Sequence, residues 1–233
     1  AAHGFDVSRP ARDAKEAFQW LYFGYLAAVK ENDGAAISLG RVDAFLDVYL
    51  ERDLISGVLP SESAAQELVD NLVMKLRVVR HLRPKAYDDL FAGDPVWATC
   101  AVAGAREKGG HLVTKTSWRF LRTLENLGPA PEPNLTVLWD GDALPAPFKA
   151  YAASVSIATS ALQYENDAAM RAAFTSDDVA VSCCVSGLAL GRDTQFFGAR
   201  VNLPKLLLYA LNGGVDEITG ARVAPESLDS DLG

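Results

Sequence analysis

The sequence predicts an α/β fold. Segments with the periodicity of amphipathic helices alternate with short extended runs that turn-forming residues bound. This alternation is typical of parallel strands joined by helices. With 233 residues, 49% of them hydrophobic, the chain can bury a sizeable core. It has no internal repeat, low-complexity segment or domain linker, so we expect residues 1–233 to form one continuous unit.

The first predicted element is a helix over residues 13–31, whose apolar part, residues 18–29, is buried. That part is too short to cross a bilayer, which needs about 20 apolar residues, so no membrane class fits. A strand is expected at residues 35–39, and a second helix at residues 42–55.

The clearest helix is predicted over residues 61–82, where apolar residues recur at spacings of three and four behind a Ser61 cap. Another helix, over residues 114–127, ends at Gly128 and Pro129. A strand at 135–139, a helix at 147–161, a strand at 179–185 and a helix at 203–211 complete the prediction. Three strands for six helices are too few for a closed barrel, which indicates part of a larger fold.

The net charge of the chain indicates which kinds of ligand it can bind. The chain has 22 basic and 30 acidic residues, a net charge of -8, and no basic run, so nucleic acid is not an expected partner. A small anionic substrate would need a local arginine inside a pocket. Three cysteines make no disulfide framework, and no secretory signal is present, so we expect a cytoplasmic location.

Two adjacent thiols, Cys183 and Cys184, stand in an apolar run. Inert packing is one interpretation, because buried cysteine behaves as a small hydrophobe. A disulfide between them is disfavoured, because adjacent Cα atoms lie about 3.8 Å apart and disulfides need about 4.4 to 6.8 Å. A shared metal is also disfavoured, because neighbours on a strand point to opposite faces. Such thiols could pass a hydrogen atom between a substrate and a partner.

Arg200 follows two phenylalanines and a glycine. Its guanidinium could bind a carboxylate through two parallel hydrogen bonds, and a structural ion pair is the alternative. Cys100 is interpreted as a core residue. The three histidines lack the spacing of a catalytic triad or a zinc site, and no dinucleotide or phosphate loop is present.

A series of motifs, in order and at near-constant spacing, resembles pyruvate formate-lyase, a glycyl radical enzyme. The motifs are GAAISLGR at 34–41, FLDVYLERDL at 45–54, VMKLR at 73–77, GDPVWAT at 93–99, PEPNLT at 131–136, LQYEND at 162–167, CCVS at 183–186 and QFFGAR at 195–200. The resemblance implies that the chain is part of a ten-stranded α/β barrel built from two antiparallel half-barrels. It also implies reversible cleavage of pyruvate with coenzyme A to acetyl-coenzyme A and formate, with no metal taking part.

The resemblance assigns roles to individual residues. Cys184 would receive the radical from a glycine, and Cys183 would attack the pyruvate carbonyl and hold the acetyl group. Arg200 would bind the substrate carboxylate. The other implied substrate-binding positions, which would line the pocket, are Phe91, Trp97, Phe197, Ala35 and Ala36.

The chain also departs from the family pattern. The radical glycine of the family lies in a C-terminal Arg-Val-Ser-Gly-Tyr motif that this chain lacks, and a second carboxylate-binding arginine is also missing. We therefore expect a central fragment that is inactive alone. A radical-SAM activating enzyme and a homodimer are implied for the full-length protein. Gly187 stands where the family usually has proline.

Three other functions stay open. One is cleavage of 2-ketobutyrate, since one extra methylene in an apolar pocket changes binding by only about 1 to 3 kcal/mol. Another is a non-catalytic barrel fragment that needs a partner carrying the radical glycine. The third, a thiol-disulfide oxidoreductase, rests on the thiol pair alone.

Overall fold

The computed structural model describes residues 6, 8–32, 37–79, 85, 89, 96–182, 186–193 and 202–223. The chain divides into two compact units, residues 1–195 and 196–233, and each is described by itself. The expectation that residues 1–233 form one continuous unit stays a prediction.

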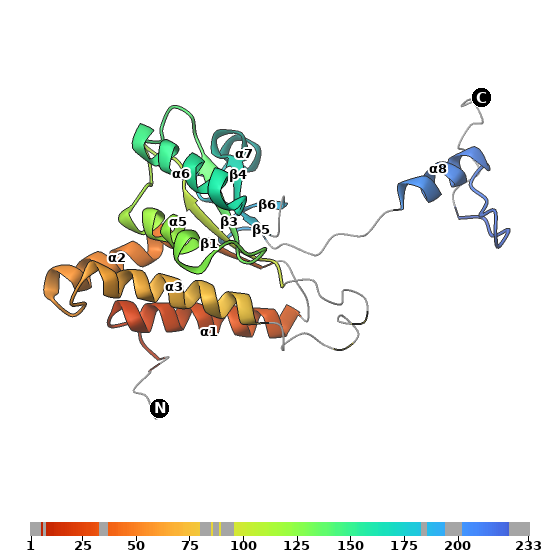
Figure 1. Cartoon of the computed structure of the whole chain (residues 1–233). Coiled ribbons are helices and arrows are strands. Elements are labelled where there is room, and N and C mark those ends of the chain that lie inside the picture. Colours follow the sequence, from red (N-terminus) through yellow and green to blue (C-terminus); the bar gives the residue numbers. More distant parts are fainter. Residues whose placement is uncertain are drawn as a thin grey trace. The chain divides into compact units, whose positions relative to one another are not determined.

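The first unit holds helices and strands in alternation (Figure 1). Its elements are α1 (Ala14–Asn32), β1 (Ile37–Arg41), α2 (Val42–Ser56), α3 (Glu62–Val78), β2 (Ala98–Ala103), α5 (Lys115–Leu127), β3 (Asn134–Trp139), α6 (Ala146–Thr159), β4 (Leu162–Asn166), α7 (Asp167–Phe174), β5 (Val179–Ser182) and β6 (Ser186–Ala189).

Four of these strands form one sheet in the order β1-β2-β3-β4, and every neighbouring pair is parallel. The predicted α/β class with parallel pairing is therefore confirmed. β5 and β6 form a separate antiparallel hairpin, so the expectation that the strand at 179–185 pairs in parallel is wrong. The two strands pair antiparallel because only three residues separate them in the sequence, whereas a parallel connection needs about a dozen or more.

Local sequence explains where the predicted helices begin. The Ser61 hydroxyl accepts the N–H of Ala64 at 3.2 Å and caps α3. Thr114 and Ser117 cap α5 reciprocally through each other's backbone N–H. The predicted helices are confirmed within the described residues. α7 was not predicted, and it follows the cap residue Asn166, whose side chain accepts the N–H of Ala169.

The two faces of the sheet have different neighbours. Cys100, Val102 and Val137 belong to the main core beneath the helices, so the prediction that Cys100 is a core residue is confirmed. On the opposite face Ala101 and Leu138 pack against Ala180 of β5. Figure 1 shows the same arrangement, with α1, α2, α3, α5 and α6 on one side of the sheet and the β5–β6 hairpin with α7 on the other.

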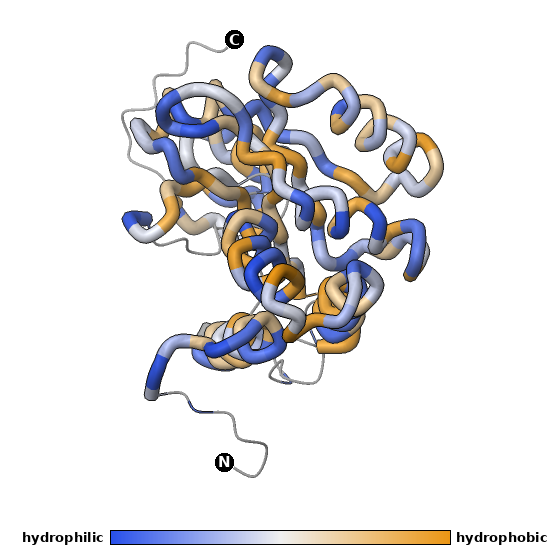
Figure 2. Tube along the Cα trace, turned by 90° about the vertical axis from the view of Figure 1, so that its left-hand side faces the viewer, coloured by the Kyte–Doolittle hydropathy of each residue, from blue (hydrophilic) through white to orange (hydrophobic). Residues whose placement is uncertain are grey.

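Of the helices that cover the core, α3 and α5 are clearly amphipathic, and Figure 2 shows hydrophobic and hydrophilic residues mixed along the helices. Among the described residues no helix is both long enough and apolar enough to span a membrane.

The second unit contains α8 (Leu203–Leu211), which Asn202 caps by accepting the N–H of Lys205. The ammonium group of Lys205 lies 2.9 Å from Asp216 and 2.6 Å from Glu217. These two carboxylates raise the pKa of Lys205.

Candidate functional site

The adjacent cysteines belong to the connection between β5 and β6. Ser182 at the end of β5 pairs with Ser186 at the start of β6. Cys183 and Cys184 lie between these two residues in the sequence and outside the described residues. All four residues of β5 are buried, and the strand contacts β1 and β2. The hairpin that carries the cysteines is therefore seated on one face of the parallel sheet.

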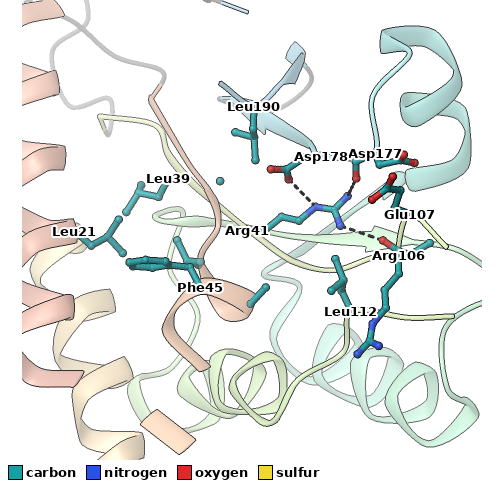
Figure 3. A pocket seen from close by; sticks show the side chains of 14 residues that line it. Leu21, Leu39, Arg41, Phe45, Arg106, Glu107, Leu112, Asp177, Asp178 and Leu190 are labelled. Carbon is teal, nitrogen blue, oxygen red and sulfur yellow. Dashed lines mark hydrogen bonds and ion pairs between the residues drawn. The ribbon is translucent and has the colours of Figure 1, made fainter. Parts of the chain in front are cut away.

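Arg41, the last residue of β1, joins the hairpin to this sheet. Its side chain is 5% exposed, and its guanidinium donates four hydrogen bonds. Figure 3 draws those to the carbonyls of Ala105 and Asp177, together with the ion pair with Asp178 at 3.6 Å. Nε donates to the carbonyl of Val179 at 3.3 Å, and Nη1 donates to the carbonyl of Ala105 at 3.2 Å. Nη2 donates to Asp167 Oδ1 at 3.2 Å and to the carbonyl of Asp177 at 3.3 Å. One side chain thus connects β1, the loop after β2, the start of α7 and the start of β5.

Asp167 is the carboxylate of this cluster. It is fully buried at the first position of α7. Its Oδ2 accepts the N–H of Ala105 at 2.7 Å, and its Oδ1 accepts from Arg41. A buried charge persists only when it is paired and hydrogen-bonded, and the Asp167 carboxylate has both kinds of partner. We call Arg41 and Asp167 the buried ion pair.

Gly104 leaves room for the buried ion pair. Its φ is +92°, in the region that favours glycine. A Cβ at this position would lie 3.1 Å from Leu138 Cβ and 3.3 Å from both Arg41 Nη1 and Asp167 Oδ2. The absence of a side chain therefore allows the backbone to pass directly over the two charged groups.

A cavity of about 720 Å³ lies beside the buried ion pair. Figure 3 shows the Arg41 guanidinium turned toward Asp177 and Asp178, with leucines and Phe45 on the other walls. Trp97, the one predicted substrate-site residue that the structure describes, is not among the described residues that line this cavity. Among the described lining residues, the three carboxylates of Glu107, Asp177 and Asp178 face only two guanidinium groups, those of Arg41 and Arg106, so these walls carry a net negative charge and do not favour an anionic ligand.

Asp43 is a second buried carboxylate near the carboxyl ends of the strands. It accepts hydrogen bonds from Ser117 Oγ at 2.5 Å and from the N–H groups of Ala103 and Ala44 at 2.7 Å. Burial nevertheless raises the pKa of Asp43 to about 6. Burial also raises the pKa of the Cys100 thiol, which keeps that thiol protonated and unreactive.

Trp97 is the one predicted substrate-binding residue that the structure describes. It is half-buried and directly precedes β2. Its φ is +61°, a conformation that costs a residue other than glycine about 1–3 kcal/mol. The N–H groups on both sides of it donate to the Glu132 carboxylate, that of Val96 at 3.3 Å and that of Ala98 at 3.0 Å.

The other predicted site residues, Cys183, Cys184, Arg200, Phe91, Phe197, Ala35 and Ala36, lie outside the described residues. Ala35 and Ala36 immediately precede Ile37 in the sequence, and the register partner of Ile37 is Ala98, which follows Trp97. The structure thus describes the surroundings of the predicted site, and the assembly of these side chains into one pocket stays a prediction.

Sequence reasoning missed Arg41, Asp167 and Glu132 as residues of the site's surroundings. Each stands in a motif that was noticed only for its resemblance. A usable signal existed for Arg41, which closely follows the predicted strand at 35–39, because functional residues gather at the carboxyl ends of parallel strands. Asp167 directly follows β4, a strand that was not predicted. Within the described ranges, no group of three or more His, Cys, Asp or Glu side chains is placed to hold a metal ion.

The fold defines a class of protein. The chain is similar in structure to a glycyl radical enzyme from Archaeoglobus fulgidus, with a TM-score of 0.75 and 23% identity over 94% of this chain and 29% of that one. It is also similar to the B12-independent glycerol dehydratase from Clostridium butyricum, with a TM-score of 0.73 and 23% identity over 94% of this chain and 28% of that one. The chain therefore has the α/β barrel fold of the glycyl radical enzymes, in part.

Sequence comparison identifies the family. The profile of the pyruvate formate lyase-like family matches residues 1–231, and the chain belongs to this family. It is 59% identical to the PFL-like enzyme TdcE and 58% identical to formate acetyltransferase 1, both of Escherichia coli, over 227 residues that cover 97% of this chain. A formate acetyltransferase of Haemophilus influenzae is 56% identical over the same length and share of this chain. The chain spans 29 to 30% of the length of these relatives.

Proposed function

We propose that this chain is the thiol-bearing segment of a formate C-acetyltransferase, which cleaves pyruvate with coenzyme A to acetyl-coenzyme A and formate. The observation that carries the proposal is the 58% identity to formate acetyltransferase 1 over 97% of the chain, with the CCVS motif at 183–186 inside the matched region. The proposed setting is a cytoplasmic enzyme that is a homodimer and is activated by a radical-SAM enzyme.

The proposed chemistry uses the two thiols in turn. When present, the glycyl radical supplies an unpaired electron by taking the hydrogen atom of the Cys184 thiol. The hydrogen atom of the Cys183 thiol then passes to Cys184, which leaves a thiyl radical on Cys183. No general base is needed, because a hydrogen atom moves rather than a proton.

The thiyl radical forms and breaks bonds at the substrate. The Cys183 sulfur adds to the carbonyl carbon of pyruvate, and the bond from this carbon to the carboxylate carbon breaks. An acetyl thioester stays on Cys183, and the released carbon dioxide radical anion takes the Cys184 hydrogen atom to become formate. The radical is then on Cys184 again. The thiol of coenzyme A displaces the acetyl group from Cys183, which recovers a thiol.

One feature of the described surroundings supports these roles. β5 is buried over its whole length, so the segment leading into the cysteines is shielded from water, which favours radical chemistry. Arg200 is proposed to bind the pyruvate carboxylate through its guanidinium. This local positive charge would offset the repulsion between an anionic substrate and a chain with a net charge of -8. Phe91, Trp97, Phe197, Ala35 and Ala36 are proposed to line the pocket.

The test is a chimera in which this chain replaces the matching 227 residues of formate acetyltransferase 1. The chimera is activated without oxygen, and the glycyl radical is measured by electron paramagnetic resonance. We expect formation of acetyl-coenzyme A from pyruvate. Cys183→Ser and Cys184→Ser should each abolish it, whereas Cys100→Ala, which removes a buried core thiol, should retain it.

Two results would overturn the proposal. One is an activated chimera that carries the radical but forms no acetyl-coenzyme A. The other is undiminished turnover in either serine variant. The same assay with 2-ketobutyrate measures whether the pocket prefers the longer ketoacid, a difference of one methylene that is worth about 1 to 3 kcal/mol.

A further inference from the structure

The backbone at Trp97 is held in a conformation that tryptophan does not favour. Its φ of +61° lies in the left-handed region, where a Cβ crowds the neighbouring carbonyl. Residues other than glycine keep such a conformation only where the surroundings over-determine it. The contacts of the two neighbouring residues show what holds it.

Both neighbours of Trp97 donate their backbone N–H to one carboxylate. Glu132 Oε2 accepts from Val96 at 3.3 Å, and Oε1 accepts from Ala98 at 3.0 Å. Glu132 is 2% exposed, so water does not compete for these N–H groups. Two amides on either side of one residue, directed at one side chain, restrict the backbone between them.

This carboxylate replaces part of the sheet. The parallel ladder between β2 and β3 begins at the pair Thr99 and Asn134, and the residue before Asn134 is Pro133. Val96 and Ala98 precede the first rung of the ladder on the β2 side. Glu132 supplies their acceptors from its side chain, so the backbone N–H groups on both sides of Trp97 are hydrogen-bonded outside the β2–β3 ladder.

We propose that Glu132 is a positioning residue that fixes Trp97 as a wall of the substrate pocket. Glu132 does not touch the substrate, and it acts through the backbone on either side of the indole. The inference rests on the proposed function, because that function gives Trp97 its place beside the ketoacid. Loss of the carboxylate should therefore weaken ketoacid binding and leave radical formation intact.

The test uses the activated chimera and the substitution Glu132→Gln. Glutamine keeps the volume but has one acceptor oxygen, and its NH₂ group would face one of the two backbone donors. We expect KM for pyruvate to rise about tenfold, a change of about 1.4 kcal/mol, with the radical signal unchanged.

A double-mutant cycle separates positioning from general structural support. Glu132→Gln is combined with Trp97→Ala, which removes the indole. If Glu132 acts through Trp97, the rise in KM vanishes in the Trp97→Ala background, because no ring is left to misplace. If Glu132→Gln does not accumulate as folded protein, Glu132→Asp retains both acceptor oxygens on a shorter arm and enters the same cycle.

Other results of these experiments would contradict either the positioning role of Glu132 or the proposed function. An equal rise in KM with and without the indole overturns the positioning role, as does a Glu132 variant with unchanged KM. Inactivity of the parent chimera despite its radical signal overturns the proposed function and the inference with it. Activity of the parent chimera without coupling between the two residues overturns the inference alone.

Discussion

Replacing Arg41 by methionine tests the role of the buried ion pair. Methionine matches much of the length of the side chain but carries no charge. The substitution leaves the Asp167 carboxylate with the Ala105 N–H as its partner among the contacts described above. It also removes the donor from the carbonyls of Ala105, Asp177 and Val179.

The expected loss of unfolding free energy follows from the burial of both side chains of the pair. The Arg41 side chain is 5% exposed and that of Asp167 is 0% exposed, so the remaining charge would stay in a medium that solvates it poorly. Removal of one partner of a buried pair costs about 3–5 kcal/mol, a large part of a typical unfolding free energy of about 5–15 kcal/mol. The double substitution Arg41→Met with Asp167→Asn should cost less than Arg41→Met alone, because no buried charge is then left.

The assay is urea unfolding of the 233-residue chain followed by circular dichroism, with hydrogen exchange of the β5 amides as a local probe. Arg122→Met is the matched control, because Arg122 is 61% exposed and pairs with Glu125 at the surface, where a pair contributes about 0–1 kcal/mol. The reasoning is refuted if Arg41→Met costs less than about 1 kcal/mol, or if adding Asp167→Asn makes the loss greater.

Three further predictions concern single residues. Burial raises the pKa of Asp43 from 3.8 to about 6, so the contribution of this carboxyl group to the free energy of unfolding is fully present below about pH 4 and falls by about 3 kcal/mol as the pH rises through 6. The loss of unfolding free energy caused by Asp43→Asn, measured by urea titration, should therefore shrink by a similar amount between pH 4 and pH 7. A loss that does not change with pH would contradict this prediction. In thermal unfolding, Gly104→Ala should lower the melting temperature more than Gly57→Ala does. Both glycines have positive φ, but of the two only Gly104 has neighbours within 4 Å of the added Cβ. Equal decreases in melting temperature would show that these close contacts do not matter. Ser61→Ala should lower the unfolding free energy by about 1 kcal/mol through loss of the α3 cap, and hydrogen exchange in the first turn of α3 should rise, whereas unchanged exchange there would exclude the cap.

Local interactions explain why the helices could be predicted. The helix α3 carries its own cap at Ser61 and its own apolar stripe, so a window of sequence contains the information. β2 was missed for the opposite reason. Its alanines have weak strand preference, and the strand forms because β1 and β3 pair with both of its edges.

The residues that organise the site were harder to foresee. The partners of Arg41 are 64 to 138 residues away in the sequence, and no local pattern relates them. The left-handed backbone at Trp97 is likewise invisible in the sequence, because the residues that usually adopt it are glycine, asparagine and aspartate. The resemblance to a known family pointed to Trp97, and the structure adds the Glu132 carboxylate that holds the backbone on both sides of it.

The strand order has a consequence for synthesis on the ribosome. Because β1 to β4 lie in the sheet in the order in which they are translated, each new strand can add to the edge that the previous strand has just formed. Arg41 emerges with β1, but Asp167 follows 126 residues later, after the fourth strand is complete. At about 5–20 residues per second, the arginine of a nascent chain waits on the order of ten seconds for its carboxylate. The hairpin with the two cysteines follows Asp167 in the sequence, so β5 leaves the ribosome after all four strands of the sheet against which it packs.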